Sequence, residues 1–302
     1  MGEQSVDFRD VDTYSYKYYR DTYEYLAGFS ILIMGVVIGA VMFNDGYGTN
    51  VYTELLSVVA TIAILDRRSE RREQRRHERE TKIQLIRAVA GTDNATSLKA
   101  LREIEDRNWF QGAKGILQGA YLKNANLAGA NLLRANLKGA YLMGATLTDA
   151  NLWDANLADA DLVEANLSGA NLTNSNLECA NLQVANLQGA DLGIARLEGA
   201  NLQVANLQGA DLRYANLGGA NMQFANLEGA ALEGVNLQGA CLNGAHLQNA
   251  FVCVKTARFS AETSLPNGEK WTADTDMTQF GCFVDATKYA QWRESQLQSD
   301  NL

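Results

Sequence analysis

The chain has 302 residues, 26 glycines, a single proline and a net charge of −9. From about residue 115 onward the same few residue types recur at fixed spacing, which indicates a repeat architecture and argues against two or three ordinary domains with rounded cores. The four cysteines show no C-x-x-C spacing, so a zinc site is disfavoured and free thiols in a reducing compartment are expected.

The N-terminal part of the chain predicts a transmembrane helical hairpin over residues 26–65. Residues 26–43 form an uncharged apolar run of 18 residues, long enough to cross a bilayer as a helix. Residues 1–25 before it are acidic and rich in tyrosine, which suits a membrane interface and not the start of a signal peptide. A second apolar run, 51–65, is shorter, and the turn-like stretch 44–50 separates the two runs.

The distribution of basic residues predicts the orientation of this hairpin. Arginines follow directly after Leu65, whereas the stretch 44–50 contains no Lys or Arg. Because basic flanks stay on the cytoplasmic side, both termini and the repeat region are expected in the cytoplasm. The predicted location is the inner (cytoplasmic) membrane or an internal membrane.

Small and polar residues in the two runs suggest how the hairpin packs. Gly35 and Gly39 form a G-x-x-x-G pattern, and Thr53, Ser57 and Thr61 recur at every fourth position. Packing within the hairpin explains both patterns. Contact between copies in a homo-oligomer and a pore lined by the Thr/Ser stripe are the alternatives.

Residues 66–110 are predicted to form a basic helix followed by a capping helix. Residues 66–82 contain no apolar side chain, so this helix has no face that could join a core. It is either solvated, with ion pairs between residues four apart, or attached to acidic lipid headgroups. Nucleic acid is disfavoured as a partner because the segment lacks aromatic residues for stacking. The arginines expected at the membrane surface are Arg67, Arg68, Arg71, Arg72, Arg75 and Arg76.

Apolar residues return after Ile83, and Gly91 predicts the end of the first helix. A second helix over residues 95–107 places Leu98, Leu101 and Ile104 on one face. We expect this helix to cover the first coil of the structure that follows, because an open end of stacked strands would recruit other chains.

Residues 111–254 repeat every five positions. There are 28 repeats with centres from Leu117 to Val252, and every centre is leucine except Met222 and Val252. Alanine stands two positions earlier almost throughout. A period of five fits neither an α-helix nor a straight strand. It fits a short extended piece with Ala and Leu pointing inward, followed by a corner.

These residues resemble the pentapeptide-repeat family, whose motif is A(D/N)LXX. The resemblance implies a right-handed quadrilateral β-helix in which four repeats form one coil, so the repeats would give about seven coils and a rod roughly 34 Å long at about 4.8 Å per coil. The expected fold is therefore an all-β solenoid preceded by an α-helical transmembrane hairpin and a helical linker. Residues 255–302 resemble the C-terminal extensions of this family and are expected to form a cap.

The repeat pattern disfavours catalysis. A core filled by one Leu and one Ala per side leaves no internal pocket for a substrate, so no catalytic, cofactor-binding or metal-binding residue is predicted. His77 lies on the charged helix, and His246 is expected to be a solvated outward side chain. The asparagines before the leucines, such as Asn126 and Asn186, are expected to form ladders at the corners and not to bind ligands.

Apolar stripes on the outside of the coils suggest a binding surface. Residues twenty apart stack on one side of the rod, and one such side is apolar, while Ile194 and Tyr214 fall on the opposite side. These stripes either stabilise coil stacking alone or bind a protein partner or a second copy of the chain. The predicted partner-binding residues are Val184, Val204, Phe224, Met143 and Val163.

Three functions remain open at this point. The first is a non-catalytic, membrane-tethered scaffold that presents a protein-interaction surface at the cytoplasmic face. The second is an oligomeric membrane effector or channel formed by the hairpin. The third, which only the family resemblance suggests, is a DNA-mimicking rod that binds topoisomerases; the 11 acidic and 6 basic residues of positions 111–254 make a weak field for such a mimic.

Overall fold

A computed structural model describes residues 48–111, 115–252 and 256–282, together with residues 285, 287, 288 and 291. The chain divides into two compact units, Met1–His77 and Glu78–Leu302. The first predicted span, residues 26–43, lies outside the described residues, as do Gly35 and Gly39.

Helix α2, Gly48–Val89, is a single helix of 42 residues. It continues without interruption from the apolar run 51–65 into the basic segment 66–82. No helix of the described part of the chain is long and apolar enough to cross a membrane. This finding goes against the predicted second span at 51–65, because that run is short and the helix passes directly into Asp66, Arg67 and Arg68.

Helix α3, Asn94–Asp106, begins immediately after α2 ends. Asp93 caps its first turn by accepting a 2.9 Å hydrogen bond from the Thr96 amide. The Thr96 hydroxyl also donates to Asp93, and these bonds lower the pKa of the carboxyl. The buried hydroxyl of Ser97 donates a hydrogen bond to the Val89 carbonyl oxygen at 3.2 Å. It thereby pairs one of the carbonyl groups that have no partner within the last turn of α2.

Helix α3 and the residues around it cover the first coil of the repeat region. The backbone amide of Asn136 donates a hydrogen bond to the carbonyl oxygen of Phe110 at 2.8 Å, and the backbone amide of Asn126 donates to the carbonyl oxygen of Gly91 at 3.1 Å. The Asn94 side chain donates to the Ala128 carbonyl at 3.0 Å. Leu101 and Ile104 of α3 are buried in the same hydrophobic cluster as the first leucines of the solenoid. Backbone groups that would end the stack of coils are thus paired.

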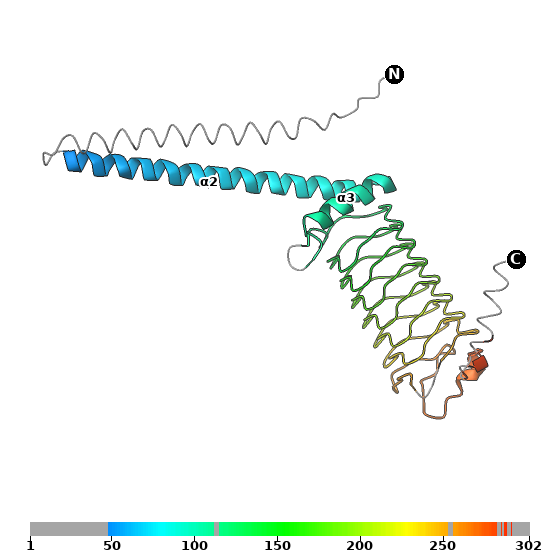
Figure 1. Cartoon of the computed structure of the whole chain (residues 1–302). Coiled ribbons are helices and arrows are strands. Elements are labelled where there is room, and N and C mark those ends of the chain that lie inside the picture. The colour runs from blue at the N-terminus through cyan, green and yellow to red at the C-terminus, as the bar shows by residue number, and fades with distance from the viewer. Residues whose placement is uncertain are drawn as a thin grey trace, which may run out of the picture. The chain divides into compact units, whose positions relative to one another are not determined.

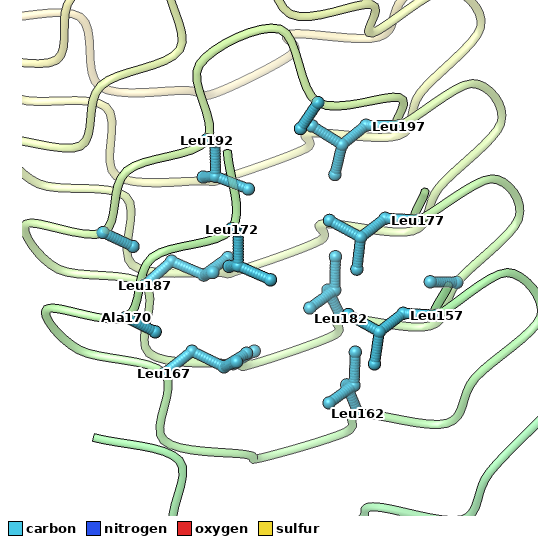
Figure 2. Packing of buried hydrophobic residues seen from close by; sticks show 14 of the residues in the cluster. Leu157, Leu162, Leu167, Ala170, Leu172, Leu177, Leu182, Leu187, Leu192 and Leu197 are labelled. Atoms are coloured by element: carbon cyan, nitrogen blue, oxygen red, sulfur yellow. The ribbon is translucent and has the colours of Figure 1, made fainter. Parts of the chain in front are cut away.

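The repeat region is a solenoid of stacked coils (Figure 1). Parallel bridges join residues twenty apart, from Tyr121 with Tyr141 to Ala231 with Phe251. Four five-residue repeats therefore make one coil. The leucine and alanine side chains point inward and stack on their equivalents in the next coil, as Leu157, Leu177 and Leu197 do in Figure 2.

The repeat satisfies the backbone N–H groups of each corner, as the repeat around Leu187 shows. Leu187 and Gly189 donate to the next coil, Ala190 closes a turn on Leu187, and Asp191 donates to the previous coil. The remaining amide, that of Gln188, donates to the side chain of Asn186 at 3.2 Å. Where Asn or Asp precedes the leucine, as Asn186 does, its side chain therefore satisfies a backbone amide of the corner.

The same asparagines also bond from coil to coil. Asn186 donates through its side-chain amide to Asn166 at 3.1 Å, and Asn206 donates in the same way to Asn186 at 3.1 Å. Asn226 continues the series to Asn206 at 3.2 Å. The predicted asparagine ladder is present.

The solenoid continues beyond the last regular repeat, in a changed register. Asn236 pairs with Arg258 and Cys241 with Ser264, so the spacing grows from twenty residues to 22 and then 23. The Thr263 hydroxyl donates to the Leu237 carbonyl at 2.8 Å. The short 3-10 helix η2, Met277–Phe280, follows, and Met277 and Cys282 are buried with the core. Burial raises the pKa of the Cys282 thiol to about 12.

Candidate interaction surface

Each corner of the solenoid places the residue two positions after the leucine in the left-handed region of backbone space. Glycine, Asn and Asp tolerate this conformation best. Three corners nevertheless carry β-branched residues, Val184 at φ 61°, Ile194 at φ 59° and Val204 at φ 61°. A β-branched residue with positive φ is a genuine outlier, so the backbone of these corners is strained.

The strained corners are also exposed and apolar, and they form two edges. The VVF edge consists of Val184, Val204 and Phe224, whose exposed fractions are 48%, 48% and 60%. The IY edge consists of Ile194 and Tyr214, with exposed fractions of 58% and 59%. Because ten residues are half a coil, the two edges lie at opposite corners of the same coils.

A glycine one coil further on accommodates each of the two aromatic rings. The Phe224 ring lies against Gly244 and the Tyr214 ring lies against Gly234, so closely that a Cβ at either glycine would clash with the ring. Beyond Tyr214, a groove of about 460 Å³ is lined by Tyr214, Gly234, Asn236, Thr256 and Arg258, among others. The IY edge therefore ends in a concave surface.

The VVF edge is uncharged, whereas the IY edge carries more acidic than basic side chains, Asp191, Asp211 and Glu233 against Arg213. Residues 181–186, 201–206 and 221–226, which include the VVF edge, contain no charged side chain. On the IY edge, Arg213 forms an ion pair with Asp211, and Arg213 Nε lies 2.8 Å from the carboxylate oxygen Oδ1. The hydrogen bonds to Asp211 raise the pKa of the Arg213 guanidinium. The VVF edge is thus suited to contact with a surface that it does not repel, whatever the charge of that surface.

The structure groups only three of the five predicted partner-binding residues. Val184, Val204 and Phe224 occupy the same corner of three consecutive coils. Met143 and Val163 are half-buried and lie one position before the corner, in the column that Gln183 and Gln203 continue. They border the VVF edge and do not belong to it.

The residues predicted to meet the membrane or to pack helices are placed only in part. All six predicted arginines, Arg67, Arg68, Arg71, Arg72, Arg75 and Arg76, lie on α2 and are exposed. Thr53 also lies on α2. Ser57 and Thr61 are exposed, and the Thr61 hydroxyl donates to the Ser57 carbonyl at 2.8 Å within the helix.

The exposed Tyr121 and Tyr141, which were not among the predicted site residues, precede the leucines of the first two coils on the side of the VVF edge. Their ring centroids are 6.2 Å apart. Two aromatic residues twenty positions apart at the same place in the repeat were the signal. The strain at the corners was not predicted either, although the frequency of glycine at this position indicates a left-handed backbone.

Residues that could support other chemistry are dispersed. In the described ranges, no group of three or more His, Cys, Asp or Glu side chains is placed to hold a metal ion. His246 is exposed, and Cys179, Cys241 and Cys282 are free thiols. Cys253 lies outside the described residues.

Comparison with known proteins identifies the repeat. The family model described as Pentapeptide repeats matches overlapping stretches at 116–154, 140–178, 155–193, 180–217 and 210–249. Proteins of this family are generally non-catalytic. A search of curated proteins found none that matches the chain.

Solved structures of cyanobacterial proteins are similar in sequence. HetL from Nostoc, a pentapeptide-repeat protein involved in heterocyst differentiation regulation, is 31% identical over 51% of this chain and 82% of its own, with a TM-score of 0.25. The pentapeptide-repeat protein alr5209, also from Nostoc, is 35% identical over 37% of this chain and 82% of its own, with a TM-score of 0.32. Rfr23 from Cyanothece is 36% identical over 35% of this chain and 63% of its own, with a TM-score of 0.23. The chain belongs to the pentapeptide-repeat family.

Proposed function

We propose that this protein is a non-catalytic, membrane-tethered scaffold whose solenoid, of the right-handed quadrilateral type, presents a protein-interaction surface at the cytoplasmic face. The observation that carries the proposal is the VVF edge. Its valines hold a left-handed backbone that costs roughly 1–2 kcal/mol per residue, and their side chains remain half exposed. Strain of this kind is expected where a surface is used for binding.

The tether is inferred from the sequence and the basic helix. The uncharged run 26–43 has the length of a membrane-spanning helix. Downstream, six exposed arginines of α2 suit acidic lipid headgroups, each contributing about 1 kcal/mol when close to the surface. The solenoid would then lie on the cytoplasmic side of an inner or internal membrane.

One experiment tests both parts of this proposal. Membranes from cells that express the tagged full-length chain are washed with alkaline carbonate, crosslinked and subjected to affinity capture. We expect the chain to stay in the washed membranes. We also expect the triple variant Val184→Gln, Val204→Gln and Phe224→Gln to remain membrane-bound but to lose its crosslinked partner.

A matched control is Gln188→Ala, which changes an exposed residue on another side of the rod. Its capture should equal that of the unaltered protein. Release of the chain by carbonate would refute the membrane tether. Unchanged capture of the partner by the triple variant would show that the VVF edge only stabilises the stack of coils.

A further inference from the structure

We infer that the partner of the VVF edge is the IY edge of a second copy of this chain, so that the solenoids pack side by side in parallel rows. This inference rests on the proposed function, because it names the partner of the same surface. Three observations support it: the register of the two edges, the groove beyond Tyr214 and the lack of charge.

The register follows from the uniformity of the coil. Every repeat has nearly the same corner conformation, with φ of 61° at Val184, 59° at Ile194 and 61° at Val204, so the chain rises by the same amount in each repeat. At about 4.8 Å per coil, two repeats rise about 2.4 Å. Ile194 therefore lies at a height midway between Val184 and Val204, on the opposite edge. Tyr214 lies midway between Val204 and Phe224.

A second copy that is shifted sideways, without rotation or change of height, brings these two edges together. Its Ile194 then faces the gap between Val184 and Val204, and its Tyr214 faces the gap between Val204 and Phe224. The two rows of side chains interdigitate, as in the close-packed core of an interface.

Phe224 has a defined place in this arrangement. Its height lies between those of Tyr214 and Gly234, so it meets the neighbour where the groove of about 460 Å³ opens. That groove is lined by Tyr214, whose ring lies over Gly234, and by Arg258, whose guanidinium can lie against an aromatic ring. A buried aromatic anchor in a pocket is the usual centre of a protein interface.

Charge favours a second copy at these edges. The chain carries a net charge of −9, so two copies repel one another over most of their surfaces. The segments 181–186, 201–206 and 221–226 are uncharged, and on the opposite edge Asp211 is paired with Arg213 while Asp191 and Glu233 lie nearby. The carboxylates of the IY edge therefore meet an uncharged surface, and the contact brings no like charges together at its centre.

The contact is heterologous, because each copy offers one edge and receives the other. Such a contact does not close on itself when the copies are related by a sideways shift, so it builds rows. All solenoids of a row keep the same direction, with their capped first coils at one side of the row. This is the orientation that copies tethered in one membrane require.

Cysteine crosslinking of the full-length chain in membranes tests the arrangement. In a background without the native cysteines, one tagged copy carries Val204→Cys and a differently tagged copy carries Ile194→Cys. We expect mixed dimers after mild oxidation, and no dimers when either variant is expressed alone. A chain with both substitutions should give a ladder of dimers, trimers and larger products.

Two further variants separate the possible outcomes. Gln188→Cys together with Val204→Cys is the matched control and should give no series of crosslinked products. Adding Phe224→Ala to the chain with Val204→Cys and Ile194→Cys should reduce the yield of crosslinked products at least tenfold. Self-crosslinking of Val204→Cys alone would overturn the inference in favour of a two-fold dimer. Absence of any ladder would overturn it too, and capture of a different protein in the same membranes would leave the scaffold function standing without self-association.

Discussion

At the scale of single residues, the repeat tolerates few deviations, and Ser175 is an informative one. It occupies a position that is alanine in almost every other repeat, and it is completely buried. Its hydroxyl oxygen makes no hydrogen bond within the described part of the chain. A buried hydroxyl without a partner destabilises a protein, whereas alanine leaves only apolar surface there.

We therefore expect Ser175→Ala to raise the free energy of unfolding by about 1 kcal/mol. Chemical denaturation of the two proteins measures the difference, and Ser168→Ala on the outside of the same coil region serves as control. A loss of stability in Ser175→Ala would mean that the hydroxyl has a partner that the packing does not reveal.

The strained valines lead to a second expectation at this scale. Glycine adopts the left-handed corner without strain, at an entropic cost of about 0.5–1 kcal/mol, whereas valine there costs roughly 1–2 kcal/mol. Val184→Gly and Val204→Gly should each leave thermal stability equal or slightly higher, while partner capture falls. If either substitution lowered the melting temperature markedly, the valines would be stabilising the stack of coils, as the alternative interpretation of the stripes holds.

At the scale of the coil, the leucine ladder is the main source of stability. Leu187 is fully buried and stacks on its equivalent in the preceding coil, Leu167 (Figure 2), and its equivalent in the next coil is Leu207. Leu187→Ala should lower the free energy of unfolding by about 2–5 kcal/mol, because the stacked coils hold the cavity open. The exposed neighbour variant Gln188→Ala should change it little. Equal stabilities in urea titrations would contradict the assignment of inward and outward positions.

Sequence periodicity was sufficient to predict the coil but not its ends or its corners. The five-residue spacing of Leu and Ala identifies the inward side chains, and every Leu centre of the described repeats is buried. The continuation through Arg258 and Ser264 was missed because two and then three additional residues break the register there. Left-handed corners were missed at Val184 and Val204 because these residue types normally avoid that conformation.

At the scale of the whole molecule, each coil contacts only the coils before and after it, so the covered ends matter as much as the core. The carbonyls of Gly91 and Phe110 pair with amides of the first coil, and the hydroxyl of Thr263 serves a carbonyl of the last. A chain of this kind behaves as a one-dimensional stack in which an uncovered end loosens first. The two interaction edges begin in the middle coils, and the groove beyond Tyr214 reaches Arg258 at the C-terminal end of the solenoid.

The twenty-residue register limits how this chain can grow by duplication. Residues 181–192 and 201–212 share the identical sequence NLQVANLQGADL, the signature of one copied coil. An insertion of twenty residues returns every later side chain to its own side and lengthens the VVF edge by one residue. An insertion of a single repeat would instead turn everything after it by one side, so that Phe224 would leave the line of Val184 and Val204. Lineages of this protein should therefore differ in length by whole coils within the middle of the rod, and each added coil should add one residue to each edge.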